Sequence, residues 1–444
     1  MKILFKFCKY LKPISTSLSP NTEKDDIFLT LRVILQPWKW KISANQRFHP
    51  RPFAILNPRK SMLEILEEEF RKYFNVNYAF SFNSGRSALL AILKSLELEN
   101  SNEVLLQAFT CNAVVNPILW MGLKPVFVDC NENTFNIDLE DLKRKITPKS
   151  KVIIVQHTFG SPVDLEEILE ICQKNNIILI EDCAHSLGAT YKGKKIGTFG
   201  KAAFFSFGRD KVISSVYGGM VITNDDFLAK KLKRFQEEIS YPSYFWTLQQ
   251  LLHPLLMNLL ILPTYRILGK YLLVFFQSIG FLSKAIHSKE KRGEKPDYFP
   301  QKLPNALAIL ALYQFKKLKR FINHRKKITD FYFKELKDSP FELPKIFSDQ
   351  EQILLRFSIK HPQAHQIIKE AQKKNLLLGD WYFSPVAPQD TELNKMKYRI
   401  GSCPKAEKLS KITINLPTHI NISLKKAKEI IDFFQMFSNK NINT

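Results

Sequence analysis

Short apolar segments alternate with amphipathic ones from Met62 to Thr223, and this alternation restricts the fold more than any other feature of the chain. The predicted strands are Val104–Leu106, Pro125–Val128, Val152–Val155, Ile177–Ile180, Ala203–Ser206 and Met220–Thr223. The predicted helices, with apolar residues three to four positions apart, are Met62–Phe74, Ala88–Leu96 and Leu165–Lys174. Strands without polar alternation are typical of a mainly parallel sheet covered by helices on both faces. We therefore predict an α/β fold whose ligand lies at the carboxyl ends of the strands.

The chain has 444 residues, enough for two domains. We predict four segments: an N-terminal extension over 1–60, a large α/β domain over 61–239, an apolar insert over 240–300, and a helix with a smaller α/β domain over 301–444. The elements predicted in the last segment are a helical stretch Pro304–Tyr332, strands Leu354–Ile359 and Lys411–Leu416, and a closing helix Lys425–Phe437.

The insert carries no formal charge from Ser240 to Tyr265, although Pro254 and Pro263 interrupt it. Its length approaches that of a membrane span, but the prolines argue against a simple crossing. Two interpretations remain open. Residues 240–285 form an interfacial hairpin that contacts a membrane surface, or they pack on the protein core or on a second subunit. The basic and apolar first 15 residues suggest either a surface-seeking helix or an ordinary terminal segment.

The formal net charge of +24 fits an anionic substrate, an anionic membrane surface, a nucleic acid, or a compositional bias of the genome. The chain has no helix-turn-helix, RNA-stacking or zinc-finger motif, so we expect no nucleic-acid partner. The basic run from Lys316 to Lys327 is predicted to be a solvated helix face. The six cysteines include no Cys-x-x-Cys pair, which favours a reduced, cytoplasmic compartment and no metal site.

Lys211 follows the predicted strand Ala203–Ser206 after a short turn, and Gly218–Met220 come soon after it. Upstream, Asp182 ends another strand, while Glu181 beside it is expected to point to the opposite face. Pyridoxal phosphate (PLP) needs a lysine for its aldehyde, a carboxylate for its ring nitrogen, and donors for its phosphate. The order and spacing of these residues predict a PLP site in the large domain, with Lys211 and Asp182 as the catalytic residues.

Donors for the phosphate are predicted where Ser84, Gly85 and Arg86 open a helix. Backbone N–H groups at a helix N-terminus bind anions, and the Ser206 hydroxyl would add another donor. His185 is expected to contact the phenolic oxygen of the cofactor or the substrate. A helix cap or a structural histidine would explain each feature alone, so the prediction depends on their combination.

Several motifs together resemble the DegT/StrS family of PLP-dependent sugar aminotransferases. They are Asn83–Leu89, Lys124–Asp129, His157–Pro162, Ile180–Tyr191, Gly197–Gly200, Ser206–Gly219 and Ile414–His419. The resemblance runs from about Met62 to Phe437, apart from the insert. It implies the PLP-dependent transferase fold type I, a homodimer with sites at the subunit interface, and Lys211 as the lysine that holds PLP.

The chain also departs from the family pattern. Val216 and Tyr217 stand where the family usually has Gly-Glu, and Cys111 aligns with an aromatic residue that commonly stacks on the cofactor ring. Cysteine covers a ring only by soft contact. Pro300–Pro304 replaces a family segment with Asn and Arg-Met, which leaves the contacts across subunits open.

The resemblance implies transfer of an amino group from an amino acid, L-glutamate, to a nucleotide-linked keto sugar in glycan or envelope polysaccharide biosynthesis. Lys211 would also carry the proton as general base and acid. Sugar dehydratases of the family have His at this position, so Lys211 argues against that branch. Two alternatives remain: another reaction of a fold-type-I PLP enzyme, and a non-catalytic, membrane-associated scaffold. The expected location is the cytoplasm, at the inner membrane face if the insert contacts lipid.

Overall fold

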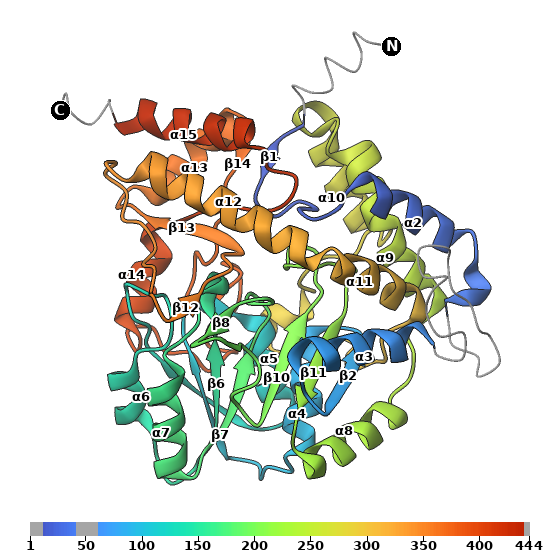
Figure 1. Cartoon of the computed structure of the whole chain (residues 1–444), viewed down its shortest axis with the longest axis vertical. Helices are drawn as coiled ribbons and strands as arrows, with labels where there is room; N and C mark the ends of the chain where they lie inside the picture. The colour runs from blue at the N-terminus through green and yellow to red at the C-terminus, as the bar shows by residue number, and fades with distance from the viewer. Residues whose placement is uncertain (1–11, 41–60, 439–444) are drawn as a thin grey trace.

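The computed structural model describes residues 12–40 and 61–438, so residues 1–11 of the proposed surface-seeking helix lie outside the described part. Its centre is a seven-stranded sheet with the order β2-β11-β10-β7-β6-β3-β5 (Figure 1). The strands are β2 Tyr78–Phe82, β3 Glu103–Gln107, β5 Lys124–Val128, β6 Ser150–Gln156, β7 Ile178–Asp182, β10 Ala202–Ser206 and β11 Gly219–Thr223. All neighbours pair in parallel except β11, which is antiparallel to both β10 and β2. The six predicted strands are confirmed; β2 was not predicted.

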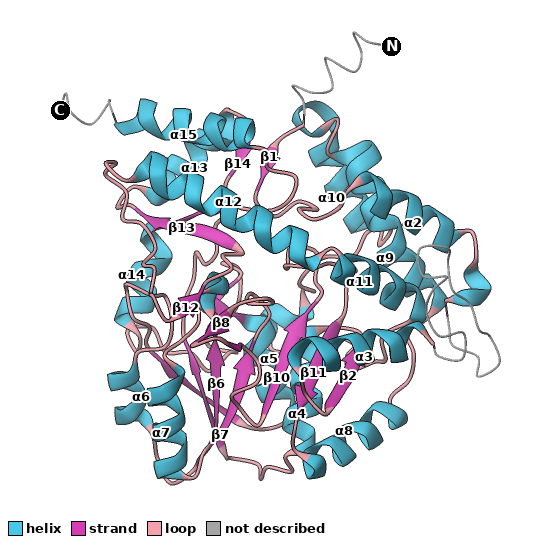
Figure 2. Cartoon of the chain, viewed as in Figure 1, coloured by secondary structure: helices cyan, strands magenta, loops and turns pink. Residues whose placement is uncertain are grey.

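Helices cover both faces of this sheet (Figure 2). One hydrophobic core joins the sheet to α3 (Met62–Phe74), α7 (Leu165–Asn175) and α11 (Asn305–Lys316). A second core on the other face includes α4 (Gly85–Ser95), α5 (Asn112–Trp120) and α8 (Asp226–Glu238). Side chains alternate between the faces of a strand, so each strand contributes to both cores and must be apolar throughout.

A smaller C-terminal α/β unit has its own core. Its elements are α12 Leu318–Leu336, β13 Arg356–Lys360, α13 Ala364–Lys373, α14 Pro404–Ile412, β16 Thr413–Pro417 and α15 Leu424–Ser438. β13 and β16 pair antiparallel. The predicted strand from Lys411 begins two residues later, because Lys411 and Ile412 complete the last turn of α14. Shorter elements are α6 Leu139–Lys145, β4 Thr110–Cys111, β8 Thr190–Tyr191, β9 Lys194–Lys195, β12 Gln350–Glu351 and β15 Val386–Ala387.

The described part of the N-terminal extension packs into the fold. β1 (Ile14–Ser15) pairs in parallel with β14 (Leu376–Leu377), and α2 (Lys24–Ile34) packs against α9 (Tyr244–Leu256) and α11. Between them, the Asn21 amide donates to the backbone oxygen of Lys211 and, at 3.1 Å, to that of Val212. The N-terminal segment therefore fixes the backbone of the loop that carries Lys211.

The basic run in α11 and α12 is not entirely solvated, so this prediction was wrong for two residues. Arg325 is buried and donates to the backbone oxygen of Leu355 at 3.0 Å and to the Thr418 hydroxyl at 2.7 Å. Lys317 is mostly covered and pairs with Asp26 at 2.9 Å. Both cations tie α11 and α12 to the segments packed against them.

The insert is helical, with α9 (Tyr244–Leu256), π-helical turns η4 (Met257–Ile261) and η5 (Tyr265–Gly269), and α10 (Lys270–Ser278). Among the described residues, no single helix is long and apolar enough to cross a membrane. Two arms, Tyr244–Ile261 and Tyr265–Ser278, reach that length and composition only together, and a bend of 112° separates them. α9 is partly buried, whereas α10 has no buried residue.

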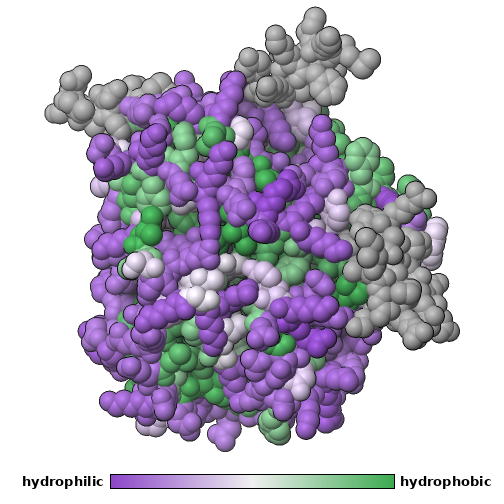
Figure 3. All heavy atoms as spheres, viewed as in Figure 1, coloured by the Kyte–Doolittle hydropathy of each residue, from purple (hydrophilic) through white to green (hydrophobic). Residues whose placement is uncertain are grey.

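Apolar side chains remain exposed on both arms, on the neighbouring α2 and just beyond the ends of these helices. We call this set the apolar face: Phe28, Leu31, Leu35 and Trp38 with Phe245, Leu259, Ile267, Leu268, Tyr271, Val274, Phe275 and Ile279. Figure 3 shows a mainly hydrophilic surface, with hydrophobic side chains at the upper right edge where α10 and α2 lie. So many exposed apolar side chains on neighbouring elements are unusual on a protein that meets only water.

Candidate active site

A cavity of about 260 Å³ lies at the carboxyl ends of β7 and β10, the edge of the sheet where the sequence places the ligand. The eight residues predicted for the site all line it: Ser84, Gly85, Arg86, Cys111, Asp182, His185, Ser206 and Lys211. The structure thus brings together residues from four separate parts of the chain.

Lys211 lies in the loop after β10, and burial lowers the pKa of its amine. Its Nζ is 4.5 Å from the centroid of the Trp381 ring. Because the ammonium is costly to bury, the amine of Lys211 loses its proton more easily than that of a surface lysine. A lysine that binds an aldehyde and carries protons needs this property.

Asp182 is the last residue of β7 and faces the cavity. Its Oδ1 accepts the backbone N–H of Ala184 at 2.9 Å. Burial raises the pKa of Asp182 to about 6, because no solvent stabilises the carboxylate. A cationic group in the cavity would relieve this cost, which suits a carboxylate that binds a protonated ring nitrogen.

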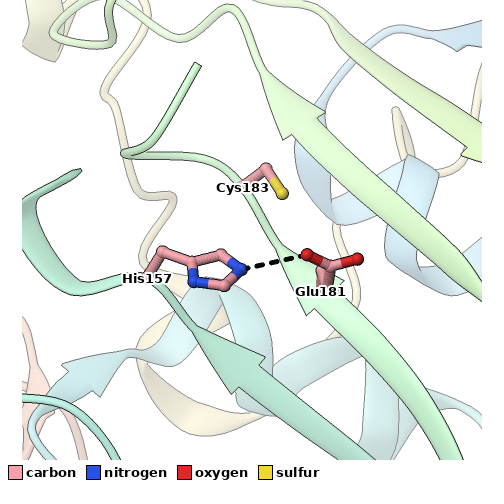
Figure 4. Close-up of side chains that lie close together, drawn as sticks. All are labelled: His157, Glu181 and Cys183. Carbon is pink, nitrogen blue, oxygen red and sulfur yellow. Dashed lines mark hydrogen bonds and ion pairs between the residues drawn. The ribbon is translucent and has the colours of Figure 1, made fainter. Parts of the chain in front are cut away.

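Glu181 points away from the cavity, as expected, and lies beside His157 and Cys183 in the buried cluster of Figure 4. Its carboxylate accepts backbone N–H groups from Gly197, Phe199 and Gly200 at 2.7 to 2.8 Å. It also lies 3.3 Å from Nε2 of His157.

This cluster could hold a metal ion by its composition, but its hydrogen bonds leave His157 no lone pair. Nδ1 accepts the N–H of Val163 at 3.2 Å, so Nε2 carries the proton that faces Glu181. Burial alone would raise the pKa of Glu181, yet the hydrogen bonds from His157 and the backbone outweigh it and hold that pKa below its usual value. The cluster therefore anchors two loops to β7: the loop 197–200 through Glu181, and the loop at Val163 through His157.

The N-terminus of α4 forms one wall of the cavity. Ser84 caps the helix by accepting the N–H of Ser87 at 3.0 Å, and the first N–H groups of a helix have no partner within it. A Cβ on Gly219 would lie 2.4 Å from the backbone carbonyl oxygen of Ser84. A Cβ on Gly85 would lie 3.0 Å from Cβ of Ser206. Glycine at both positions lets three segments converge on one cradle with donors for an anion.

The Arg86 side chain contacts residues 283–290, which lead from the insert helices back to the large domain; we call them the return segment of the insert. Its Nε lies 2.9 Å from the buried carboxylate of Glu290, and Nη2 donates to the backbone oxygen of Ala285 at 2.8 Å. These contacts engage part of the Arg86 guanidinium with the insert; its backbone N–H, the predicted donor, lies in the first turn of α4.

His185 and Cys111 line the cavity, and an aromatic segment that was not predicted joins them. The His185 ring stacks on Trp381 at 5.1 Å between centroids, and its Nε2 is 3.5 Å from the Tyr382 hydroxyl. Burial holds the pKa of His185 well below its ordinary value, so the ring is neutral. The aromatic triplet Trp381–Phe383 was the available sequence signal, but nothing in its local pattern places it near Lys211.

Val216 and Tyr217, which stand where the family usually has Gly-Glu, form an unusual turn in the cavity wall. Val216 has a φ of 70°, the left-handed region where glycine is favoured and a β-branched residue is strained. Tyr217 donates to the backbone oxygen of Lys284 at 2.7 Å and so fastens this turn to the insert. Strained backbone in a cavity wall is typical of a functional site.

The residues of the cavity fit the chemical groups of PLP. A half-buried lysine suits the aldehyde, and the glycine-lined helix N-terminus suits the phosphate. The buried carboxylate of Asp182, which forms no ion pair with a described residue, suits the ring nitrogen.

Comparison with known proteins places the chain in a family. The sequence profile of the DegT/DnrJ/EryC1/StrS aminotransferase family matches residues 60–244 and 275–435, so the chain belongs to that family. Residues 245–274, within the insert, lie outside the match. The chain is 40% identical over 167 residues to GDP-perosamine synthase of Caulobacter vibrioides, which is 38% of this chain and 45% of that protein. It spans about half the length of the curated relatives it matches.

Solved structures share the whole fold. PseC of Helicobacter pylori, an aminotransferase involved in the biosynthesis of pseudoaminic acid, covers 97% of this chain and all of its own, with a TM-score of 0.72 and 21% identity. The PLP form of a Streptococcus pneumoniae protein assigned as a sugar aminotransferase has a TM-score of 0.73 at 21% identity over 96% and 99% of the two chains. These likenesses confirm the predicted fold type.

Proposed function

We propose that this chain is a PLP-dependent aminotransferase that moves an amino group from an amino acid, L-glutamate, to a nucleotide-linked keto sugar in glycan or envelope polysaccharide biosynthesis. One observation carries the proposal: Lys211, Asp182 and the N-terminus of α4 line a single cavity in a chain of an aminotransferase family. The relatives named as GDP-perosamine synthases support a nucleotide-linked sugar as acceptor.

The cofactor would supply an electron-withdrawing pyridine ring. Asp182 would hold the ring nitrogen by an ion pair, since its carboxylate has no other cation bonded to it in the described chain. The first N–H groups of α4 and the Ser206 hydroxyl would bind the phosphate. His185, as a neutral ring with a proton on Nε2, would donate toward the phenolic oxygen or the substrate.

Lys211 would have two roles. Its Nζ would hold the aldehyde of the cofactor, and when the donor amino acid occupies that position the free amine would accept and return a proton. The lowered pKa of Lys211 supports the second role, because a deprotonated amine is the form that acts as base. The Trp381 ring beside Nζ limits the directions in which the amine moves.

The direct test is product analysis with L-glutamate and a nucleotide-linked keto sugar. We expect 2-oxoglutarate and an amino sugar in equal amounts from the wild type and neither product from Lys211→Ala. Cofactor binding without 2-oxoglutarate would instead support another fold-type-I reaction, which the unusual Val216 and Tyr217 motivate. A wild type that binds no PLP would support the non-catalytic scaffold.

We further propose that the apolar face docks on an anionic membrane surface from the cytoplasmic side. α10 has no buried residue, and exposed basic residues lie on α2 and on the second arm: Lys24 and Arg32 in α2, Arg266 and Lys270 in the arm Tyr265–Ser278. Apolar burial joined to positive charge is how monotopic proteins bind acidic lipid. A net charge of +24 strengthens the attraction.

Sedimentation with vesicles of phosphatidylserine and phosphatidylcholine tests this docking. The wild type should sediment, less so at high salt, and Val274→Asp with Phe275→Asp should abolish it. Ile400→Asp is the matched control, since Ile400 is 75% exposed but lies outside the apolar face. The resemblance also implies a homodimer, and light scattering of the wild type and the double variant tests it. If the double variant has a different oligomeric state but sediments with vesicles as the wild type does, the apolar face contacts a second copy of the chain and the lipid proposal is wrong.

A further inference from the structure

The cavity wall contains a half-buried cation that the proposed mechanism does not use. Arg86 pairs with Glu290, and Arg356 pairs with Asp210 at 3.1 Å. Arg209 lines the same cavity but forms no ion pair with any carboxylate in the described chain. A guanidinium that is partly removed from water and has no counter-ion is unfavourable, so an anion that reaches Arg209 would relieve this cost.

Hydrogen bonds fix the guanidinium of Arg209 and leave part of it free. Nη2 donates to the Ser283 hydroxyl, which donates in turn to Oε1 of Gln250 at 2.6 Å. The guanidinium carbon lies 5.6 Å from the ring centroid of Tyr217. Its Nε is buried and has no hydrogen-bond partner among the described residues.

Arg209 lies three residues after Ser206, in the loop that leads to Lys211. Ser206 packs closely against Gly85, the first residue of α4. The helix end, Ser206 and Arg209 thus line the same cavity. Planar guanidinium groups bind phosphoryl oxygens strongly, and helix N-termini favour the same ligands.

We propose that Arg209 binds a phosphoryl group in this cavity and supplies the positive charge that Arg86, neutralised by Glu290, does not. The proposal rests on the proposed function and deepens it. The phosphoryl group belongs to PLP or to the diphosphate of a nucleotide-linked sugar, and the shared chemistry is a phosphoryl anion beside the end of α4.

The insert positions this arginine. Ser283 lies in its return segment, and Gln250 lies in α9, within the residues that the family profile does not match. The chain Arg209–Ser283–Gln250 therefore connects the apolar insert to the cavity. Ser283→Ala should weaken phosphoryl binding less than loss of Arg209 itself, because it removes a positioning residue and leaves the cation.

The test titrates cofactor-free protein with PLP and with pyridoxal, which lacks the phosphate, and follows the visible absorption of the lysine-bound compound. We expect Arg209→Gln to weaken PLP roughly tenfold to a hundredfold, as for a lost hydrogen bond to a charged group, and to leave pyridoxal unchanged. Arg209→Lys should recover part of the loss. Arg234→Gln is the matched control, since this side chain is 83% exposed and removes the same charge from the surface.

A second arm measures binding of GDP and UDP to the PLP-loaded protein by calorimetry. Weaker nucleotide binding by Arg209→Gln with unchanged PLP affinity assigns the arginine to the substrate diphosphate. Unchanged affinity for both PLP and nucleotides overturns the proposal. If the wild type binds neither PLP nor pyridoxal, the proposed function is wrong, and nucleotide binding alone then decides the role of Arg209: a loss in Arg209→Gln supports it, and no nucleotide binding overturns it.

Discussion

Asp182→Asn should stabilise the cofactor-free protein while it destroys the site. Asn keeps the oxygen that accepts the Ala184 N–H and removes a carboxylate that is costly to bury. The pKa of Asp182 rises from 3.8 to about 6 in the folded chain. At about 1.36 kcal/mol per pH unit, ionised Asp182 costs the folded state roughly 3 kcal/mol.

The pH dependence follows from the raised pKa. The stability associated with protonated Asp182 is fully present below pH 3.8 and is lost as the pH rises through about 6. Asp182→Asn escapes this loss. The variant should therefore gain about 3 kcal/mol over the wild type at pH 8 and about half of that at pH 5.

Urea unfolding of the cofactor-free proteins between pH 5 and pH 8 measures this difference. With PLP present, the wild type should instead be more stable than the variant. Ligand binding stabilises the folded wild type, and the variant lacks the carboxylate that binds the ring nitrogen. A variant that is less stable than the wild type without PLP, or equally more stable at pH 5 and pH 8, would refute the reasoning.

Three further substitutions test the surrounding structure. Gly219→Ala should displace the first turn of α4 and weaken PLP roughly tenfold or more without loss of the folded circular-dichroism signal; normal affinity would show that the cradle tolerates a Cβ. Asn21→Ala should lower the free energy of unfolding by roughly 1 to 3 kcal/mol and broaden the cofactor spectrum, since it frees the backbone of Lys211; unchanged values would mean that the N-terminal segment does not fix this loop. Glu181→Gln should cost roughly 2 to 4 kcal/mol in urea unfolding at pH 8, because it weakens three backbone hydrogen bonds, and a neutral effect would contradict the anchoring role.

The central sheet was predictable because each parallel strand is buried on both faces and is apolar throughout. β2 was missed because it follows α3 after only a short turn, and the neighbouring helical pattern obscured it. The structure also shows why the prediction of a fully solvated basic face from Lys316 to Lys327 was wrong. Arg325 and Lys317 have partners in segments remote in sequence, and charge spacing along one helix does not reveal them.

The candidate site was predictable where chemistry follows a local order, as with Asp182, Lys211 and the glycine-rich helix start. Arg209 stands inside the same motif, yet its sequence context is that of an ordinary turn residue. Its importance depends on Ser283 and on the ion pair that neutralises Arg86, and both come from the insert. Trp381 likewise reaches Lys211 only through the packing of the C-terminal unit against the sheet.

The most direct measurement of the central claim is the absorption spectrum of the purified protein beside Lys211→Ala, before and after L-glutamate is added. The account predicts a visible band of lysine-bound PLP in the wild type only, and its conversion to the spectrum of the amine form by L-glutamate. A band that L-glutamate leaves unchanged would contradict the proposed donor. The absence of any band after PLP is added would contradict the assignment of Lys211 and the aminotransferase function with it.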